Sequence, residues 1–223
     1  MSDASRKPLL ADLYSQYLQN QDSARFVRQV RQYYGQGTLE RLAEHPVREV
    51  RRAAILALGF LGDYSANHTM GRALLDEDRS VRMLAENGIR SVWNRAGSET
   101  EQQDLQIIFR LIGAQHFDAA IQRATALIEK SAWLAEAWNQ RAIALFSLGR
   151  YAESIRDCHQ ALELNPYQFG AAAGMGQAYL RLGNHVSALE SFRRALRLNP
   201  GLEGVRVQVV RLARLVEGNQ PDR

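Results

Sequence analysis

Cys158 is followed directly by His159, and a thiol beside an imidazole is a pair that could perform nucleophilic chemistry. Adjacent side chains on a helix point in different directions, however, so the imidazole would not reach the thiol. Cys158 also takes the place that Phe192 takes in a related segment described below, and that place is typical of a helical core. We therefore expect a buried, unreactive thiol.

Metal ligation is the other chemistry that the sequence could support. The run Asp76-Glu77-Asp78 lacks the glycine and the distal glutamate of a calcium loop, and it is better explained as the cap of the helix that follows. Glycine-rich phosphate loops, nucleophile elbows and framed carboxylate pairs are also missing from the sequence. We expect no metal, no cofactor and no catalytic activity. No two histidines have the i, i+4 spacing that presents two imidazoles to one ion; they are His45, His68, His116, His159 and His185.

A 34-residue period organises the second half of the chain. The segment AEAWNQRAIALFSLGRYAESIRDCHQALELNP at 135 is followed by FGAAAGMGQAYLRLGNHVSALESFRRALRLNP at 169, so that Gly149 and Gly183 are in register, as are Pro166 and Pro200. Residues 101–134 keep the same phase with weaker residues. A fixed period of this length predicts stacked helical hairpins, because one hairpin cannot bury its apolar face alone.

A second, shorter period lies in the first half, where Val50-Arg51 recurs as Val81-Arg82. Each of these pairs begins a long apolar helix that follows a shorter one. Residues 9–18 and 24–34 have the apolar spacing of two further helices. Ser23 is predicted to cap the second of these, and Thr38 the helix after it.

The junction between the two halves is expected at Ala96–Ser98, where Ser98 and Glu101 form a capping-box pattern. The chain is therefore predicted to be an all-α solenoid of stacked antiparallel hairpins. Its predicted parts are helical repeats with capping helices over 1–97 and a second domain over 98–223, the latter with hairpins at 101–134, 135–168 and 169–202 and a covering helix at 203–217.

Composition and charge are those of an ordinary globular protein, with 46% hydrophobic and 23% charged residues. The net charge of +4 is spread evenly, and no block of like charges suggests an arm that binds a polyanion. A single cysteine excludes an internal disulfide and fits a reducing compartment. The first residues lack the apolar core of a signal peptide, and the longest apolar run, residues 53–62, is too short to cross a bilayer. We expect a cytoplasmic protein.

The 34-residue repeat resembles the tetratricopeptide repeat family, whose pattern is W-x2-L-G-x2-Y, then A-x3-F, then A and P. The middle copy departs from it at Arg141, Ala142 and Cys158. In the middle copy Trp138, Leu145, Ser154, Ala161 and Pro166 match, and in the last copy Gly176, Tyr179, Ala188, Phe192, Ala195 and Pro200.

The resemblance implies a concave groove, lined by the first helix of each hairpin, that holds an extended peptide or a helix of another protein. The arginines at the end of this groove imply a ligand with an acidic end. One subgroup grips chaperone tails through Lys, Asn and Arg, but here those places hold Leu105, Phe109, Gln140, Gly170 and Gly174, so that activity is not expected. The groove-facing residues would be Phe109, Ile112, Asn139, Ile143, Phe146, Ala173, Gln177, Leu180, Arg181, Arg211 and Arg214.

The shorter repeat of the first half resembles the short bacterial form of HEAT repeats, with the pattern L-x-D-P-x-x-x-V-R-x-x-A. The recurring arginines, Arg51 and Arg82, allow two interpretations. They could form a row of cations that meets an acidic partner, or an internal ladder to acidic groups of the adjacent hairpin, with Asp76 as the first candidate. The matching residues are Pro46, Val50, Arg51 and Ala54, with His45 in place of Asp, and then Asp76, Val81, Arg82 and Ala85.

Three functions are compatible with these patterns. The favoured one is a non-catalytic adaptor or scaffold whose partner is another protein, without membrane insertion. The alternatives are an enzyme similar to the HEAT-repeat phycobilin lyases, in which the 34-residue repeats would be foreign, and a HEAT-type protein that binds nucleic acid. The last needs clustered cations, whereas residues 1–100 hold 14 basic and 12 acidic residues. The identity of the partner and the oligomeric state are left open by the sequence.

Overall fold

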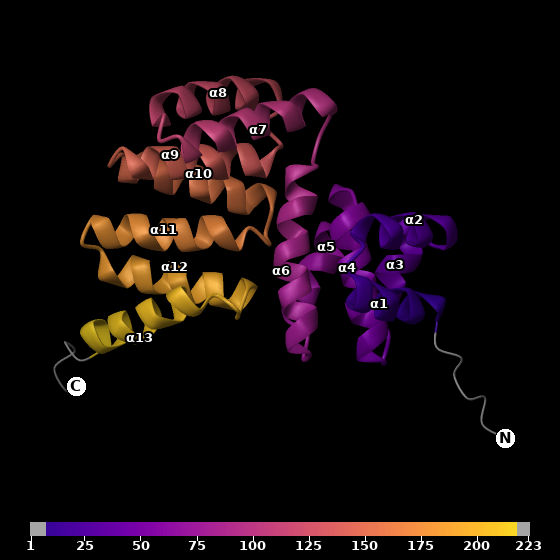
Figure 1. Ribbon diagram of the computed structural model, residues 1–223. Helices are drawn as coiled ribbons and strands as arrows, with labels where there is room; N and C mark the ends of the chain where they lie inside the picture. The colour runs from indigo at the N-terminus through magenta and orange to yellow at the C-terminus, as the bar shows by residue number, and fades with distance from the viewer. Residues whose placement is uncertain (1–7, 218–223) are drawn as a thin grey trace. The chain divides into compact units, whose positions relative to one another are not determined.

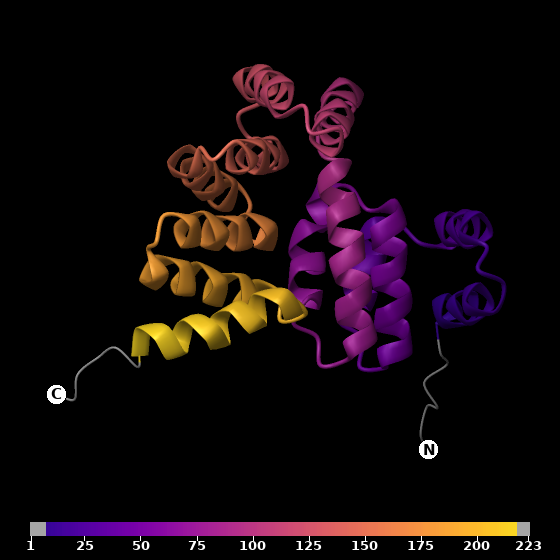
Figure 2. The same cartoon turned by 60° about the vertical axis from the view of Figure 1, so that its left-hand side comes forward.

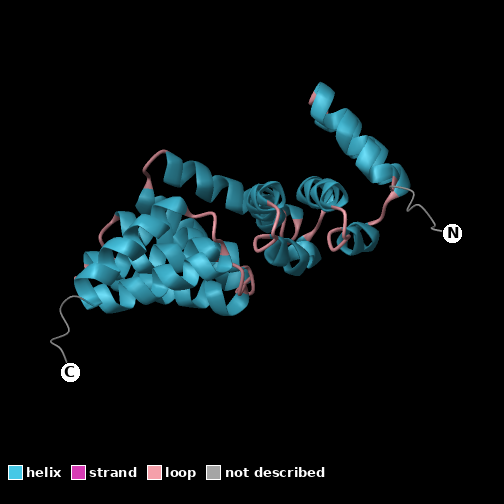
Figure 3. Cartoon of the chain, turned by 90° about the horizontal axis from the view of Figure 1, so that it is seen from below, coloured by secondary structure: helices cyan, strands magenta, loops and turns pink. Residues whose placement is uncertain are grey.

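The computed structural model describes residues 8–217, and within this range it contains α-helices, one short 3-10 helix and no strand (Figures 1 and 3). The predicted all-α class is thus confirmed. The chain divides into two compact units, Met1–Arg95 and Ala96–Arg223. Over the described range, none of the helices combines the length and the apolar character that a bilayer span requires.

The first unit is built from two pairs of a short and a long helix, preceded by two further helices. Helices α3 (Gln36–Leu42) and α4 (Arg48–Leu61) form one pair, and α5 (Asn67–Ala73) and α6 (Arg79–Asn94) the other, with η1 (Tyr64–Ala66) between the pairs. The two long helices, α4 and α6, pack on each other. They meet at Gly59 and Gly88, whose small size lets the two backbones touch.

Helices α1 (Leu9–Asn20) and α2 (Ser23–Tyr33) pack on the outside of α4. Three aromatic rings join them, since Phe26 lies 5.3 Å from Tyr17 and 6.4 Å from Phe60, measured between ring centroids. Two predicted caps were wrong in this part. Asp22, not Ser23, accepts the N–H of Arg25, and Thr38 lies inside α3, which begins two residues earlier. In both places the helix begins earlier in the sequence than predicted.

The second unit stacks three hairpins and a final helix. The hairpins are α7 (Glu99–Gly113) with α8 (Phe117–Lys130), α9 (Ala135–Ser147) with α10 (Tyr151–Leu164), and α11 (Phe169–Arg181) with α12 (His185–Leu198). Helix α13 (Glu203–Glu217) packs on α12, and successive hairpins rotate along the stack (Figure 2). Ser98 and Glu101 form the predicted capping box at the start of α7.

Each hairpin of this unit turns through a residue in the left-handed region. Gln115, Gly149 and Gly183 have φ angles of 60°, 76° and 73° and occupy the same position in successive repeats. Glycine adopts this conformation without a steric penalty, whereas a residue with a Cβ is strained there. The first hairpin therefore shares the turn of the other two, although its sequence has diverged.

The core of the second unit depends on small residues between the helices. A Cβ on Gly176 would lie 2.6 Å from the ring of Phe192, so only glycine lets α11 approach α12 this closely. In the middle hairpin Ser154 donates to the carbonyl of Ala142 at 2.8 Å. Arg141, where the repeat pattern has leucine, binds both oxygens of Asp157, at 2.7 and 2.9 Å, and lies over the ring of Trp138. A polar pair thus replaces an apolar contact at this place.

Candidate functional site

The first helix of each hairpin in the second unit, and α13 after the last hairpin, carry residues at equivalent positions of the 34-residue repeat. These positions form two rows along α7, α9, α11 and α13. All eight side chains of these rows are at least partly exposed. Both rows are apolar on α7 and α9 and end in arginine on α13. One row consists of Phe109, Ile143, Gln177 and Arg211, and the other of Ile112, Phe146, Leu180 and Arg214.

The middle of the rows combines an apolar surface with a cation. The side chain of Ile143 is 40% exposed although it is aliphatic. Next along the helix, Phe146 packs against Tyr151 with 5.3 Å between ring centroids and the rings tilted at 58°, and the guanidinium of Arg181 lies 6.0 Å from the centroid of the Phe146 ring. The structure thus brings together Phe146 and Arg181, two of the predicted site residues from different hairpins.

A buried carboxylate lies at the start of α9. Glu136 accepts hydrogen bonds from Asn139 Nδ2 at 3.2 Å, from Gln140 Nε2 at 2.6 Å and from Gln168 Nε2 at 2.7 Å. All four side chains are less than one tenth exposed, so Asn139 serves this network and presents little surface to a ligand. Sequence reasoning placed Asn139 correctly on α9 but missed Glu136 and Gln168. The available signal was a glutamate at 136 where the next repeat has Gly170.

The last predicted residues lie on α13. Arg211 and Arg214 line an open pocket together with Val207, Val210 and Leu215, as well as Arg206. The opposite face of this helix is buried, with Leu212 only 1% exposed against the core of the last hairpin. Ala173, Gln177 and Leu180 are partly buried on α11, and Leu180 packs against that same core.

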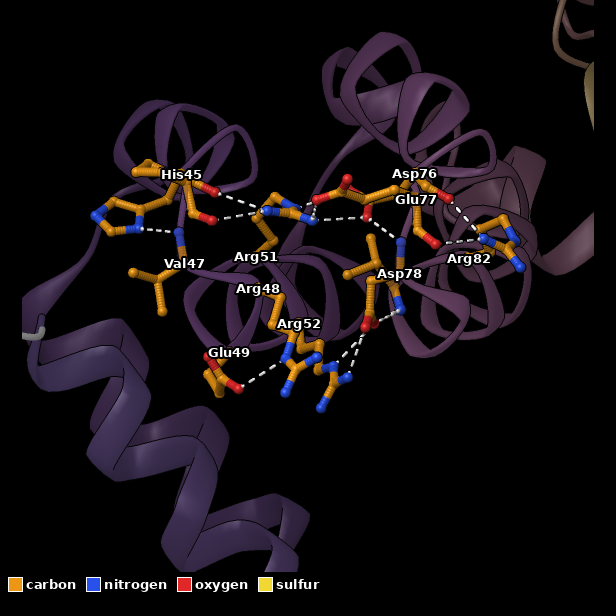
Figure 4. A network of polar contacts seen from close by, with 12 residues as sticks. His45, Val47, Arg48, Glu49, Arg51, Arg52, Asp76, Glu77, Asp78 and Arg82 are labelled. Atoms are coloured by element: carbon orange, nitrogen blue, oxygen red, sulfur yellow. Dashed lines mark hydrogen bonds and ion pairs between the residues drawn. The ribbon is translucent and has the colours of Figure 1, made fainter.

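In the first unit, Arg51 forms the internal ladder that was one of the two sequence interpretations (Figure 4). Its Nε and Nη2 donate to the two oxygens of Asp76 at 2.8 and 2.9 Å, and its Nη1 donates to the carbonyls of His45 and Pro46. Arg82 repeats the second half of this pattern, because its Nη1 donates to the carbonyls of Asp76 and Glu77 at 2.7 and 2.9 Å. Both arginines hold the loop before their own helix.

Both aspartates of the acidic run at 76–78 are engaged in hydrogen bonds, whereas the side chain of Glu77 accepts one bond from Arg51 and stays 85% exposed. Asp78 caps α6 by accepting the N–H of Val81 at 3.0 Å, and it binds Arg52 through two bonds of 2.8 and 2.6 Å. The bonds from Arg52 lower the pKa of Asp78 far below its ordinary value. The prediction that this run caps a helix is confirmed. Among the residues that the structure describes, no group of three histidine, cysteine or acidic residues could hold a metal ion.

Cys158 lies in the core of the second unit, as expected, with 2% of its surface exposed. Burial raises the pKa of its thiol to about 12, so the thiol stays protonated at neutral pH. His159 is exposed, so it does not share the buried face on which Cys158 lies. The pair therefore has neither the thiolate nor the contact that nucleophilic chemistry requires.

The repeats of the second unit match known proteins. The family model of the tetratricopeptide repeat matches residues 135–168 and 171–202. A TPR repeat-containing protein of Rhizobium etli is 32% identical over 134 residues, which span 60% of this chain and 66% of that protein. Superkiller complex protein 3 of Homo sapiens is 34% identical over 79 residues, and the match spans 5% of its length. This chain thus spans less than two thirds of these relatives.

Two solved structures share the fold of this region. The first TPR of Spaghetti (RPAP3), bound to the HSP90 peptide SRMEEVD, aligns with a TM-score of 0.52 and 21% identity over 54% of this chain and 96% of that one. The first TPR domain of human RPAP3 aligns with a TM-score of 0.51 and 20% identity over 55% and 96%. At these identities the likeness concerns the fold alone.

Proposed function

Residues 135–168 and 171–202 of this chain are tetratricopeptide repeats, and from this premise we propose that the protein is a non-catalytic adaptor. Its ligand is a peptide or helix of another protein, bound across the first helices of the second unit, α7, α9, α11 and α13. The ligand has apolar side chains followed by an acidic end, because the two rows change from aliphatic and aromatic residues to arginine along the stack. A planar guanidinium suits such a carboxylate, which it can bind through two bonds.

The observation that carries this proposal is the exposed apolar surface at Ile143 and Phe146 beside the cation of Arg181. An aliphatic side chain left 40% exposed at a position that recurs in every hairpin favours a contact with another molecule. Burying such a side chain contributes about 1 kcal/mol or more to binding. Arg181 can then select ligands with an acidic group at the adjacent place.

Recognition of chaperone tails through a carboxylate clamp is not part of the proposal. Gln140 takes one of the clamp positions, and its amide is buried and bonded to Glu136. Gly170 and Gly174 take two more and have no side chain to offer. We therefore base the proposed ligand on the residues of the two rows, and not on a clamp that binds a free carboxylate terminus.

For the first unit we propose HEAT-like pairs that act as a scaffold, supported by the recurring arginines and their equivalent loop contacts. Neither of the two alternative functions, a phycobilin-lyase-like enzyme and a nucleic-acid-binding protein, is supported by an observation on the first unit. Arg51 and Arg52 are both paired with carboxylates, which removes two cations that a phosphate backbone would need. We also place the adaptor in the cytoplasm, since its single, buried cysteine suits a reducing compartment.

Selection from a random peptide-display library tests the adaptor function. We expect the full chain to enrich peptides with apolar residues followed by aspartate or glutamate. Ile143→Glu should abolish capture of these peptides, because it places a charge in the apolar part of the rows. Val186→Glu is the matched control, since Val186 is an aliphatic residue of α12 that is 55% exposed outside the rows. Equal loss in both variants, or no enrichment by the wild type, would overturn the proposal.

A further inference from the structure

The hydrogen-bond network around Glu136 leaves side-chain oxygens that can accept further bonds. Asn139, Gln140 and Gln168 each direct an amide nitrogen toward the carboxylate. An amide carries its oxygen on the opposite arm from its nitrogen, so these bonds turn the carbonyl oxygens away from Glu136. Within residues 8–217, no group donates a hydrogen bond to the side-chain oxygen of Asn139 or Gln168, although both residues are more than nine-tenths buried.

These two oxygens face one space beside Gly170. A Cβ on Gly170 would lie 3.6 Å from Gln168 Oε1 and 4.0 Å from Asn139 Oδ1. Gly170 itself is partly exposed, and one turn later the same face of α11 holds only the small residues Ala173 and Gly174. A larger side chain at 170 would cover the oxygens. Glycine leaves them within reach of a ligand group, even though little of either side chain is exposed.

The same space lies close to a negative charge. Glu136 belongs to the first turn of α9, where the helix N-terminus stabilises a carboxylate. The amides of Asn139 and Gln168 connect this carboxylate to the space beside Gly170. A ligand group that fits there donates hydrogen bonds to the two oxygens. A positive charge on that group adds attraction to Glu136, which is strong because the surroundings are shielded from water.

We infer that the space beside Gly170 binds a basic side chain, arginine or lysine, of the peptide held in the groove. The inference rests on the proposed function, because this space is part of the same groove. Asn139 precedes Ile143 by four residues, so the two lie one turn apart on the same face of α9. A basic side chain next to the ligand residue that contacts Ile143 can therefore reach the oxygens.

The groove then has opposite charges at the two ends of α11. Arg181 follows Gly170 by eleven residues on this helix, which corresponds to about 16 Å along its axis. An extended peptide covers this distance in about five residues. We therefore expect a ligand with a basic residue about five residues from its acidic end and apolar residues between them. Reversed charges would place an acidic group against Glu136 and a basic group against Arg181, which disfavours the reversed orientation.

Fluorescence anisotropy with the full chain tests this inference. The labelled probe is a synthetic peptide with an arginine, a run of leucines, and glutamates about five residues after the arginine. In its twin, the arginine is replaced by citrulline, which has nearly the same shape and no charge. We expect the arginine probe to bind at least about ten-fold more tightly than the citrulline twin, because only the former brings a charged donor to the oxygens and to Glu136.

Two substitutions assign this preference to the space beside Gly170. Gly170→Leu should fill the space and remove the preference for arginine, and Glu136→Gln should reduce it by removing the charge. Gly204→Leu is the matched control, since Gly204 occupies the equivalent position 34 residues later and a Cβ there would meet nothing within 4 Å. This variant should keep the full preference. Circular dichroism of each variant checks that the helices remain formed.

The outcomes separate this inference from the proposed function. If the probe and its twin bind equally well, the inference is wrong and the peptide-binding groove stands. If neither peptide binds, both are wrong. A preference for arginine that survives Gly170→Leu as well as Glu136→Gln would place the basic residue elsewhere and would also overturn the inference. Ile143→Glu tests the groove separately, because it should abolish the binding of both peptides.

Discussion

Gly59 and Gly88 bring α4 and α6 into backbone contact, since a Cβ on either residue would lie 2.9 Å from the Cα of the other. A Cβ on Gly88 would in addition lie 2.5 Å from Cε of Met70. We expect Gly88→Ala to lower the free energy of unfolding by about 1 to 3 kcal/mol, because the two helices must separate to admit the methyl group. Thermal unfolding followed by circular dichroism measures this.

Gly37→Ala is the matched control for that substitution. Gly37 lies in α3 of the same unit, where a Cβ would meet nothing nearer than 3.9 Å. Alanine should therefore be neutral or stabilise the helix by up to about 1 kcal/mol. If both variants behaved alike, the contact between α4 and α6 would not be as close as described.

Asp78→Asn tests the ion pair with Arg52 and its dependence on pH. Asparagine can still cap α6, so the change removes mainly the charge that Arg52 binds. We expect a loss of about 1 to 3 kcal/mol at neutral pH. The folded state lowers the pKa of Asp78, so its stabilisation is complete above the unfolded pKa of about 3.9 and declines as the pH falls below it.

Denaturant unfolding at several pH values measures this dependence. The difference between wild type and Asp78→Asn should be constant near neutrality and should shrink below about pH 4. Asp118→Asn, at an exposed position of α8, serves as a control with the same change of charge. A difference that grew toward acid pH would contradict the assigned pair.

Gln115→Gly should stabilise the protein. Gln115 has a φ of 60°, in the same turn that Gly149 and Gly183 make, and glycine removes the steric strain of a Cβ there. We expect a gain of about 1 kcal/mol in the free energy of unfolding. Gln122→Gly, in the interior of α8, should instead cost about 1 kcal/mol. Destabilisation by both substitutions would show that the first turn does not have the conformation of the others.

Cys158→Ser should cost about 1 to 3 kcal/mol, because it places a hydroxyl among apolar neighbours. Binding of peptides to the groove should not change. In the native protein, a bulky thiol reagent should label Cys158 only as fast as the unit opens, since the thiol is buried and its pKa is raised to about 12. Rapid labelling at neutral pH would contradict this description of the site.

The fragment 98–223 should fold by itself. It retains Ser98 and Glu101, which cap the first helix, and the contacts within the second unit are made between neighbouring helices. Circular dichroism should show a helical spectrum and a cooperative thermal transition. An unfolded fragment would mean that the two units share an inseparable core.

Recurrence decided what could be predicted from the sequence. The 34-residue period predicted the helices of the second unit, and the contact between Arg51 and Asp76 was one of the two interpretations that the recurring arginines allowed. The same period, applied backward from Gly149, would also have found the left-handed turn at Gln115. The residue type at 115 does not indicate a left-handed turn by itself, because glutamine is uncommon in such turns.

Features that occur once were missed. Arg141 and Asp157 each look like a departure from the repeat, and they make sense only as a pair that faces across the middle hairpin. The network around Glu136 joins residues from α9 to the start of α11, and no sequence period relates them. The cap at Asp22 was missed because two adjacent residues, Asp22 and Ser23, are both good caps and only the backbone conformation distinguishes them.

The arginine ladder of the first unit bears on how such a protein evolves. Arg51 and Arg82 hold the carbonyls five and six residues before them through the same nitrogen, and Arg51 also reaches the aspartate of the following pair. A gene duplication that inserted one more copy of this repeat would bring its own arginine and its own acidic loop. Both neighbours would then find their partners in register, so the number of pairs could change between lineages without redesign of the core.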